Sequence, residues 1–427
     1  MNILVIGSGG REHAIVRKLK ESPKTDRLWC APGNGGIAAD AECVDIGAMD
    51  IDGVVQFAQD NPVDLVFVAP DDPLAAGMVD ALEAAGIRAF GPRANAAVIE
   101  SSKVFSKNLM KKYGIPTARY EVFSDPAAAV AYIEAENRFP VVVKADGLAL
   151  GKGVLIAEDL AAAKDAVHSI MEDKVFGASG NSVVVEEFLT GPEVSVLAFT
   201  DGRTLRPMVS SKDHKRALDG DKGLNTGGMG TVSPNPYYTD EIAQTCMETI
   251  FLPTIRAMQA EGRPFKGCLY FGLMLTPDGP KVIEYNCRFG DPETQVVLPL
   301  LQSDLLTVMM AVEEGRLAET KVEFSGGAAC CVVVASGGYP GKYERGKTIS
   351  FADTPALREA TVYHAGTKRD ETGALVTAGG RVLGVTATGA TLAEAVGKAY
   401  RAAEAASFEG AYYRKDIGAR ALAAHAG

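Results

Sequence analysis

The chain has 427 residues, too many for one hydrophobic core, and its length predicts about two to four domains. With 47% hydrophobic and 23% charged residues it has an ordinary globular composition, and no apolar run approaches the roughly 18 residues of a membrane span. The net charge of −11 excludes the basic excess that is typical of nucleic-acid-binding proteins. We therefore expect neither nucleic acid nor a membrane as a partner, and a phosphorylated ligand would need local clusters of cations and amides.

The cysteines and the first residues predict the compartment. Seven cysteines, without a C-x-x-C pair, fit reduced thiols and argue against a disulfide framework or a zinc site. No H-x-x-x-H or Cys/His spacing indicates a transition-metal site. The opening MNILVIGSGGREHA lacks a basic leader and a small-residue cleavage site. We therefore expect a cytoplasmic protein.

Strands and helices alternate in the first hundred residues. Apolar runs at 2–6 and 64–69 predict buried strands, and the segments 11–20 and 73–86 predict helices. This alternation predicts βαβ units and a parallel sheet. A segment rich in turn formers, 90–102, then leads into the helix KVFSKNLMKKYG.

The elements from about 120 to 190 are short and predict a small α+β lobe. They are helices near 126–136 and 159–170 and strands at 140–144, 152–157 and 182–188. Further on, we predict a long polar loop at 210–235 and helices near 240–261, 303–315 and 391–406. The predicted domains are 1–101, 102–323 with the small lobe, and 324–427.

The glycines of GSGG, from Gly7 to Gly10, follow a strand and open a helix. Backbone amides at such a junction can approach an anion. The dinucleotide pattern, however, requires glycine or alanine where Glu12 stands, which counts against NAD. A tight turn without a ligand is the other interpretation.

The stretch KADGLALGKGV, residues 144–154, resembles a phosphate loop but lies between two strands. A Walker loop requires a helix after it, so this is not one. It predicts a glycine-rich hairpin with Lys144 at the end of its first strand and Lys152 at its tip. Such a hairpin can fold over a triphosphate with its amides and two ammonium groups, or it can be a surface turn with solvated lysines.

Two more polar stretches are candidates for chemistry. In GPKVIEYNCRFGDPE the strand alternation places Val282, Glu284 and Asn286 on one face, and a carboxylate beside an amide oxygen suits Mg²⁺. Arg288, just past the strand, can bind a carboxylate with its forked guanidinium. The stretch 210–230, SSKDHKRALDGDKGLNTGGMG, has a cationic start and many glycines, which fits a loop that binds an anionic substrate. The alternatives are a half-exposed strand and a solvated loop.

Five stretches together resemble one family. GSGGREHA, VVVKADGLALGKGV, EEFLTGPEVS, DHKRALDGDKGLNTGGMG and IEYNCRFGDPET look like the motifs of the phosphoribosylamine–glycine ligases of the ATP-grasp superfamily, in order along nearly the whole chain. The resemblance implies an α/β and α+β multidomain fold: an N-terminal parallel-sheet α/β domain, a two-lobed ATP-grasp core and a small C-terminal domain. It also implies that the hairpin at 144–154 covers the phosphates of ATP.

The resemblance assigns roles residue by residue. Its nucleotide-binding residues are Lys103, Lys144, Gly147, Gly151, Lys152, Gly153, Glu186, Glu187, Phe188, Leu189 and Glu193. Its substrate-binding residues are Gly9, Gly10, Asp213, His214, Lys215, Arg216, Asn225, Thr226, Gly227, Gly228, Arg288 and Asp291, of which Arg288, Asp213 and Lys215 are the predicted catalytic residues. Glu284 and Asn286 would hold Mg²⁺ or Mn²⁺.

Three features depart from the family pattern. Leu150 stands where alanine is usual, and Pro192 stands where an acidic residue is common. The strand CLYFGLMLT, residues 268–276, has no carboxylate where many ATP-grasp enzymes place a second metal ligand. The number of metal ions is therefore open.

The implied reaction joins glycine to 5-phosphoribosylamine through glycyl phosphate, with cleavage of ATP to ADP and phosphate. We expect small molecules as the partners, and a monomer or weak homodimer. The alternatives are another ATP-grasp ligase or carboxylating enzyme of purine synthesis, which should not carry DHKR with TGGMG, and a dinucleotide-dependent oxidoreductase. A nucleotide-binding regulator is disfavoured by the substrate loop.

Overall fold

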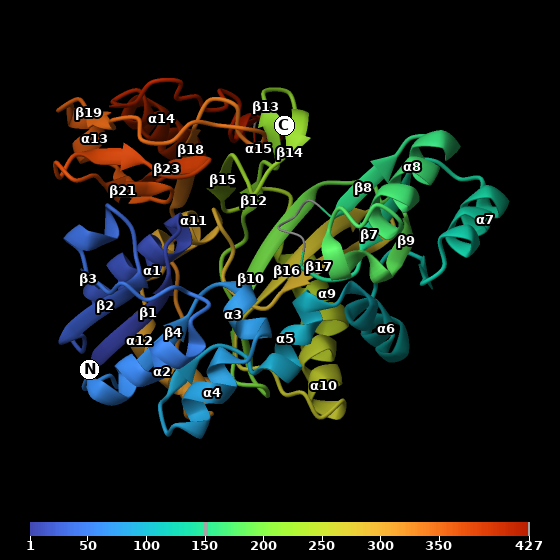
Figure 1. The fold of residues 1–427 in the computed structure, drawn as a ribbon, viewed down its shortest axis with the longest axis horizontal. Helices are drawn as coiled ribbons and strands as arrows, with labels where there is room; N and C mark the ends of the chain where they lie inside the picture. Colours follow the sequence, from blue (N-terminus) through green and yellow to red (C-terminus); the bar gives the residue numbers. More distant parts are fainter. Residues whose placement is uncertain (149–152, 426–427) are drawn as a thin grey trace.

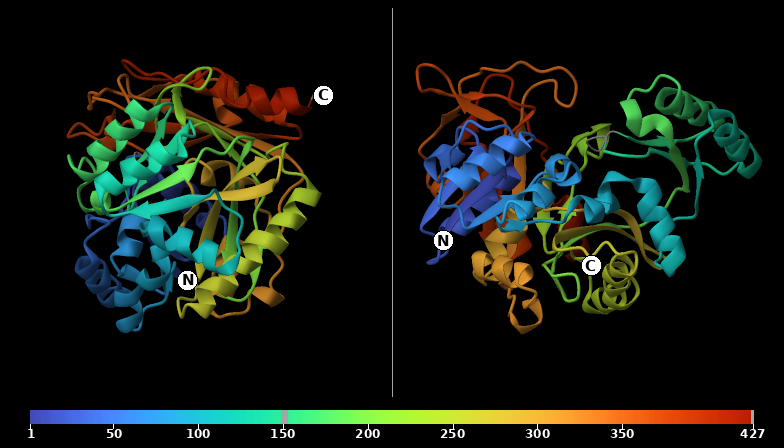
Figure 2. Two further views of the ribbon diagram at one scale, coloured as in Figure 1. Left: turned by 90° about the vertical axis from the view of Figure 1, so that its right-hand side faces the viewer. Right: turned by 60° about the horizontal axis from the view of Figure 1, so that its bottom comes forward.

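The computed structural model describes residues 1–148 and 153–425. In Figure 1 the N-terminal sheet lies beneath the C-terminal sheet, and a small lobe stands away from both beyond a central sheet. The right-hand view of Figure 2 shows the same separation from another direction. No helix in the described residues is long and apolar enough to cross a membrane.

The N-terminal sheet is parallel, with strand order β3-β2-β1-β4-β5, as the alternation of elements predicts. Because β1 and β4 are parallel, the segments that follow them lie at one edge of the sheet, where α1 and α3 begin. The strands are β1 (Asn2–Gly7), β2 (Arg27–Pro32), β3 (Glu42–Cys43), β4 (Leu65–Val68) and β5 (Ala89–Phe90). The helices are α1 (Gly10–Lys20), α2 (Ile51–Asp60), α3 (Asp71–Ala75), α4 (Met78–Ala84) and α5 (Ala94–Ser101).

Two expectations for this region are wrong. The helix predicted at 73–86 is divided into α3 and α4, because Gly77 has a φ of 90°, which favours glycine and does not continue a helix. The segment 90–102, predicted as turns, contains α5. Gly91 and Pro92 precede the helix, and the alanines within it are strong helix formers.

The small lobe has an antiparallel sheet of order β6-β9-β7-β8, packed against two helices. Both helices and three of the strands match the predicted elements, whereas β6 was not predicted. Helix α6 (Lys103–Tyr113) leads into it. The strands are β6 (Tyr120–Phe123), β7 (Val141–Ala145), β8 (Val154–Ala157) and β9 (Val183–Glu187). The helices are α7 (Pro126–Glu136) and α8 (Leu160–Met171).

The central sheet has the order β11-β10-β16-β17. Its strands are β10 (Glu193–Thr200), β11 (Leu205–Pro207), β16 (Gly267–Thr276) and β17 (Gly279–Asn286). The helix predicted near 240–261 consists of α9 (Asp240–Cys246), a π-helical turn (Met247–Phe251) and α10 (Leu252–Ala260).

The side-chain alternation predicted for β17 holds only near its end. The ladder with β16 shifts register beside Glu284, so that Ile283 is an extra residue in a β-bulge. Val282 therefore packs in the hydrophobic core with Tyr285 and does not share a face with Glu284. Glu284 and Asn286 both line the cavity described below.

The C-terminal sheet has the order β12-β15-β18-β23-β20. The long polar loop predicted at 210–235 is wrong, because this segment supplies two strands of the sheet and a separate hairpin. The sheet strands are β12 (Lys212–Asp213), β15 (Gly230–Ser233), β18 (Ala328–Ala335), β20 (Thr361–His364) and β23 (Arg381–Gly389), and the hairpin is β13 (Arg216–Leu218) with β14 (Lys222–Asn225). The domain boundaries predicted at 101 and 323 stay predictions.

The remaining helices pack on this sheet, on one another or on the N-terminal and central sheets, and the remaining strands are short. The helices are α11 (Thr294–Leu300), α12 (Leu305–Glu313), α13 (Pro355–Arg358), α14 (Leu392–Ala403) and α15 (Ala419–His425). The short strands are β19 (Ser350–Phe351), β21 (Thr367–Arg369), β22 (Leu375–Thr377) and β24 (Ala406–Ser407).

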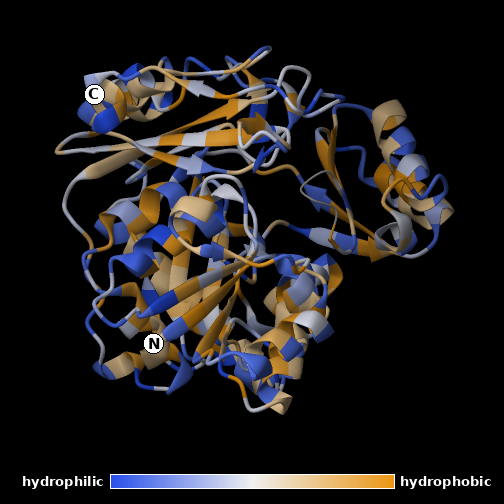
Figure 3. Ribbon diagram, turned by 60° about the vertical axis from the view of Figure 1, so that its left-hand side comes forward, coloured by the Kyte–Doolittle hydropathy of each residue, from blue (hydrophilic) through white to orange (hydrophobic). Residues whose placement is uncertain are grey.

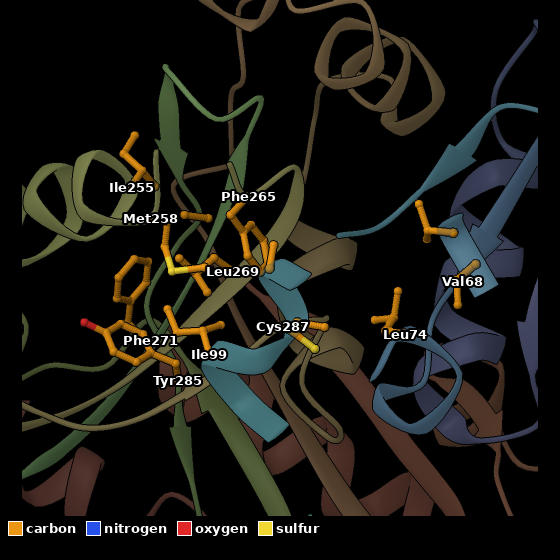
Figure 4. Packing of buried hydrophobic residues seen from close by; sticks show 14 of the residues in the cluster. Val68, Leu74, Ile99, Ile255, Met258, Phe265, Leu269, Phe271, Tyr285 and Cys287 are labelled. Carbon is orange, nitrogen blue, oxygen red and sulfur yellow. The ribbon is translucent and has the colours of Figure 1, made fainter. Parts of the chain in front are cut away.

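One hydrophobic core joins the N-terminal helices to the central sheet. Ile99 of α5 packs in the same cluster as Phe271 of β16, Tyr285 of β17 and Cys287 (Figure 4). Hydrophobic residues predominate in the strands of the sheets, whereas the outer helices contain both hydrophobic and hydrophilic residues (Figure 3). Because buried side chains pack at crystal-like density, α5 is held firmly against the end of β17.

Candidate active site

A cavity of about 1090 Å³ is lined by residues of the small lobe, the central sheet and the segment between β12 and β15. Its walls come from segments far apart in the chain. Each of the five stretches that carry the family resemblance contributes at least one residue. The fold therefore brings all the predicted motifs to one place.

Two lysines from different elements reach into the small-lobe side of the cavity. Lys103 of α6 donates from Nζ to the Gly147 carbonyl at 2.9 Å, and Lys144 of β7 donates to the Ile283 carbonyl at 3.2 Å. Burial lowers the pKa of Lys103. Their convergence supplies the local positive charge that an anion needs in an acidic protein.

A third lysine, Lys107, lies one turn beyond Lys103 and was missed by the sequence analysis. Burial lowers its pKa to about 8. Glu186 lies between lysines, with one oxygen 3.1 Å from Lys107 Nζ and the other 3.0 Å from Lys144 Nζ. The Glu186 side chain is thus committed to these cations. The i, i+4 spacing of Lys103 and Lys107 was the available signal.

The other predicted nucleotide-binding residues border the same wall. Those that line the cavity are Gly147, Gly153, Glu187, Phe188, Leu189 and Glu193. Gly147 has a φ of 95°, and a Cβ there would lie 2.5 Å from Ser179 Oγ, so glycine is required. Gly151 and Lys152, and with them the predicted hairpin tip, lie outside the described residues.

Glu284 and Asn286 have the chemistry of a magnesium site. Lys215 Nζ donates to Glu284 Oε1 at 3.2 Å, and this charge, ahead of those of Lys144 and Lys103, lowers the pKa of Glu284 to about 2. The carboxylate is therefore ionised. No group of three or more His, Cys, Asp or Glu side chains in the described residues could hold a metal ion. Mg²⁺ is commonly held by one or two carboxylates together with substrate phosphates, so this pair fits it.

Arg288 is surrounded by carboxylates at the floor of the cavity. Its Nη2 lies 3.0 Å from Glu100 Oε1 and 3.9 Å from Asp71 Oδ2. Burial alone would lower the pKa of Arg288, but Glu100 and Asp71 raise it, so the guanidinium is charged. Its Nε is buried and has no hydrogen-bond partner among the described residues. Nη1 donates to the Phe289 carbonyl at 3.3 Å, and the guanidinium lines the cavity, where its remaining N–H groups can bind a carboxylate.

The N-terminal glycine loop contacts its own helix. Gly9 N donates to Glu12 Oε2 at 2.7 Å, and a Cβ on Gly7 would lie 2.5 Å from Glu12 Cγ. The carboxylate that breaks the dinucleotide pattern thus fills the space beside the glycines. This arrangement disfavours a pyrophosphate at that position. A Cβ on Gly10 would meet Gln295 Nε2 at 2.6 Å, so Gly10 allows close packing against α11.

Asp291 connects the N-terminal loop to the C-terminal sheet. Its Oδ2 accepts from Arg11 N at 3.2 Å, and its Oδ1 accepts from Gln295 Nε2 at 2.9 Å. Arg381 of β23 lies 3.4 Å from Oδ1 and donates to the Gly227 carbonyl at 2.9 Å. Arg381 was not predicted, because nothing near it in sequence resembles a site.

Asp213 and Lys215 also line the cavity, next to Glu293. Burial, followed by the charge of Glu293, raises the pKa of Asp213 well above its usual range. Burial also raises the pKa of Glu293, whose Oε1 accepts from Tyr270 Oη at 3.2 Å. Gly228 leaves space for this carboxylate, because a Cβ on Gly228 would lie 2.6 Å from Asp213 Oδ1.

His214 differs from its neighbours because backbone groups use both ring nitrogens. Nδ1 donates to the Gly230 carbonyl at 3.0 Å, and Nε2 accepts from Gly418 N at 3.1 Å. The ring is therefore a neutral connection between the substrate segment and the C-terminal segment. The remaining predicted residues of the segment, which line the cavity, are Arg216, Asn225, Thr226 and Gly227.

Comparison with known proteins identifies related proteins and family models that match nearly the whole chain. The family models for the N domain, the ATP-grasp (A) domain and the C domain of phosphoribosylglycinamide synthetase match residues 1–100, 101–294 and 329–420. The chain belongs to the phosphoribosylglycinamide synthetase family. The predicted multidomain fold with its ATP-grasp core is confirmed, and the chain is an ATP-grasp ligase.

Relatives of the same length carry the corresponding name. Phosphoribosylamine–glycine ligase of Caldanaerobacter subterraneus is 48% identical over 98% of this chain and 100% of its own length. The ligase of Halalkalibacterium halodurans is 50% identical over 100% of this chain and 98% of its own. The crystal structure of the Thermotoga maritima ligase has a TM-score of 0.84 at 34% identity and covers 98% of this chain and 100% of that one.

For this family member we expect acid to destabilise the fold partly through His214. Burial lowers its pKa to about 4, against about 6.5 in an unfolded chain. As the pH falls below about 6.5, His214 therefore takes up a proton in the unfolded state before it does so in the folded state. The free energy of unfolding then decreases between about pH 6.5 and 4, by at most about 1.4 kcal/mol per pH unit. His214→Gln should be less stable at pH 7 but lose less of its stability across this window in urea titrations.

His168→Gln is the matched control, because His168 is exposed and its hydrogen bond with Glu172 raises its pKa. A raised pKa contributes stability below the unfolded pKa, so this control should lose slightly more in acid. An acid slope that is equal in the wild type and His214→Gln would contradict the assignment.

Proposed function

We propose that the chain joins glycine to 5-phosphoribosylamine and cleaves ATP to ADP and phosphate, giving glycinamide ribonucleotide for purine biosynthesis. The observation that carries the proposal is the meeting of all five motif stretches in one cavity. The full-length relatives named phosphoribosylamine–glycine ligase support it.

ATP would bind along the small-lobe wall. Lys103 and Lys144 would neutralise the phosphates, while the backbone of residues 186–189 would hold the adenine and Glu193 the ribose. The two lysines converge from separate elements, which supports this placement. Since a lysine is a compact point charge with rotatable donors, it suits a phosphate whose charge moves during the reaction.

Glu284 and Asn286 would hold Mg²⁺, or Mn²⁺ in its place, through one oxygen each. When bound, the ion neutralises charge on the transferred phosphoryl group. Lys215, beside Glu284, would neutralise negative charge that develops nearby.

Glycine would bind with its carboxylate at Arg288, where the guanidinium is held by Glu100 and Asp71 and one buried donor is free of protein partners in the described residues. Held in line, a carboxylate oxygen attacks the γ-phosphorus and ADP leaves, which forms glycyl phosphate. Positioning and charge neutralisation carry this step, and no protein nucleophile is needed.

The amine of 5-phosphoribosylamine then attacks the glycyl carbon, and inorganic phosphate leaves as the amide forms. This step releases one proton. Asp213 would accept it, because it borders the cavity and burial raises its pKa well above its usual range, which makes it a stronger base. His214, Arg216, residues 225–228 and Asp291 would surround the phosphoribosyl and amino-acid substrates.

The enzyme would act in the cytoplasm on small molecules alone, as a monomer or weak homodimer. The free state of all seven cysteines, each of which lies in the described part of the chain, supports a reducing compartment.

The proposal predicts that ADP release requires both glycine and 5-phosphoribosylamine. The chain is incubated with ATP and Mg²⁺, each substrate is omitted in turn, and mass spectrometry identifies glycinamide ribonucleotide in the complete mixture. ADP release that ignores either substrate, or a complete mixture without the product amide, would refute the proposal.

A further inference from the structure

Glu100 lines the cavity but belongs to none of the five motif stretches. It is the penultimate residue of α5, and its side chain is only 7% exposed. The shared core of α5 and β17 holds it against the segment that follows β17 (Figure 4). A carboxylate is rarely buried without partners, so its contacts indicate its purpose.

Three consecutive residues contact this one carboxylate, two through hydrogen bonds and one through an ion pair. Glu100 Oε2 accepts from Cys287 N at 2.7 Å, and Oε1 lies 3.0 Å from Arg288 Nη2. With the Asn286 amide nitrogen on the side of Glu100, Nδ2 donates to Oε1 at 3.0 Å and to the Tyr285 carbonyl at 3.0 Å. The amide is assigned this way because the opposite orientation places its oxygen against acceptors only.

The contact with Asn286 determines which atom of the amide serves the cavity. Because Glu100 and the Tyr285 carbonyl take the nitrogen, the oxygen is the atom left for a cation. An amide nitrogen donates and cannot ligate Mg²⁺. Without the carboxylate, the side chain loses one of the two acceptors that hold it in this orientation.

The contact with Arg288 determines how the guanidinium is presented. Glu100 Oε1 forms an ion pair with Nη2 at 3.0 Å, and Asp71 Oδ2 lies farther from the same nitrogen, at 3.9 Å. Nη1 donates to the Phe289 carbonyl at 3.3 Å, and the buried Nε has no partner among the described residues. The contacts of Nη1 and Nη2 thus fix the direction in which the guanidinium, which lines the cavity, meets a substrate carboxylate. A planar fork that is held at one end presents its remaining donors in a fixed direction.

We propose that Glu100 is a positioning residue that orients both the Asn286 amide and the Arg288 guanidinium. Through these two side chains it couples the metal subsite to the glycine subsite. The inference rests on the proposed function for the identity of the ligands. One residue of the N-terminal domain thus aligns two groups that must act on the same phosphoryl transfer.

Glu100→Gln tests the proposal while keeping the shape of the side chain. A glutamine has one acceptor oxygen and an amide that donates, so it cannot accept from all three donors. Removing the partner of a metal ligand typically costs about 10- to 100-fold in metal affinity. We expect Mn²⁺ binding in the presence of ADP, followed by electron paramagnetic resonance, to weaken by about this factor. The KM for glycine should rise about 10-fold or more, with a smaller change in the KM for ATP.

Glu83→Gln is the matched control. It also removes a carboxylate from an arginine, since Glu83 pairs with Arg93 at 2.5 Å, but this pair does not line the cavity. The control should bind Mn²⁺ and glycine like the wild type. Glu100→Asp is a second variant that keeps the charge but shortens the reach, and it should show a smaller loss in both quantities.

Wild-type Mn²⁺ affinity and wild-type KM for glycine in a folded Glu100→Gln or Glu100→Asp protein would overturn the proposal. Loss of folding in both variants would also overturn it, because Glu100 would then be needed for structure and not for orientation. Failure of the proposed function would be seen separately, as a wild type that binds Mn²⁺ with ADP but forms no product from glycine and 5-phosphoribosylamine.

Discussion

Glu284→Gln is expected to lower turnover by about 10²- to 10³-fold, the usual effect of removing one aligned electrostatic group. Glutamine keeps the shape of the side chain but removes the charge that faces Lys215 and the proposed metal ion. This charge is present at neutral pH, because Lys215, Lys144 and Lys103 lower the pKa of Glu284 to about 2. The kcat is measured at saturating ATP, glycine and 5-phosphoribosylamine, over a range of Mg²⁺ concentrations.

A second consequence of this variant concerns stability. A carboxylate with a lowered pKa stabilises the fold above its unfolded pKa of about 4.3, and this contribution is lost as the pH falls toward 2. The stability difference between the wild type and Glu284→Gln should therefore shrink below about pH 4.3. Glu261→Gln, which removes a carboxylate from the surface pair with Lys112, is the control for turnover. Near-normal turnover of Glu284→Gln at saturating Mg²⁺ would exclude the metal role.

Arg288→Lys is expected to lower kcat/KM for glycine by about 10²- to 10³-fold, because a lysine cannot replace a forked guanidinium. The single ammonium would pair with Glu100, whose Oε1 now lies 3.0 Å from Nη2, and no second nitrogen would be left for a substrate carboxylate. The positive charge beside Glu100 and Asp71 is kept, so the fold should survive. The loss should appear in the KM for glycine and in kcat, with a smaller change in the KM for ATP.

Arg93→Lys is the control for this substitution. Arg93 pairs with Glu83 at the surface, where one ammonium can replace the contact. This control should have normal kinetics. A glycine KM in Arg288→Lys that equals the wild-type value would show that the carboxylate binds elsewhere.

The parts of the site that could be predicted are those whose signal lies within one short stretch. Glycines between two predicted strands indicated a hairpin, and β7 and β8 do pair antiparallel. The spacing of Glu284 and Asn286 indicated that they act together, and both line the cavity, while their metal role stays a prediction. Lys144 and Glu284 line the same cavity, although 139 residues separate Lys144 from its contact Ile283. Sequence order could place each motif on an element, but only the resemblance implied that they meet.

The residues that were missed act across long distances in the chain. Glu100 contacts Cys287, 187 positions away, and its segment has a composition that predicts turns. Arg381 reaches Gly227 across 154 positions. No periodicity or local motif reports such contacts, because each is a product of packing between elements that are already folded. The β-bulge at Ile283 was missed for the same reason, since a register shift depends on the partner strand.

The segment 210–235 was misread because its polar residues have partners that local composition cannot show. His214 is satisfied by backbone groups of Gly230 and Gly418, the latter 204 positions away. A segment that contains such buried polar residues has the composition of a solvated loop, and the sequence therefore predicts a loop. Their partners become visible only when β12 and β15 join the C-terminal sheet.

The central claim is that glycine is activated as glycyl phosphate in this cavity. Glycine labelled with ¹⁸O in both carboxylate oxygens is converted with ATP and 5-phosphoribosylamine, and the inorganic phosphate is examined by mass spectrometry. If the carboxylate attacks the γ-phosphorus, one labelled oxygen leaves with the phosphate when the amine displaces it, so each phosphate should carry one ¹⁸O. Phosphate without label, formed together with the product amide, would contradict the account.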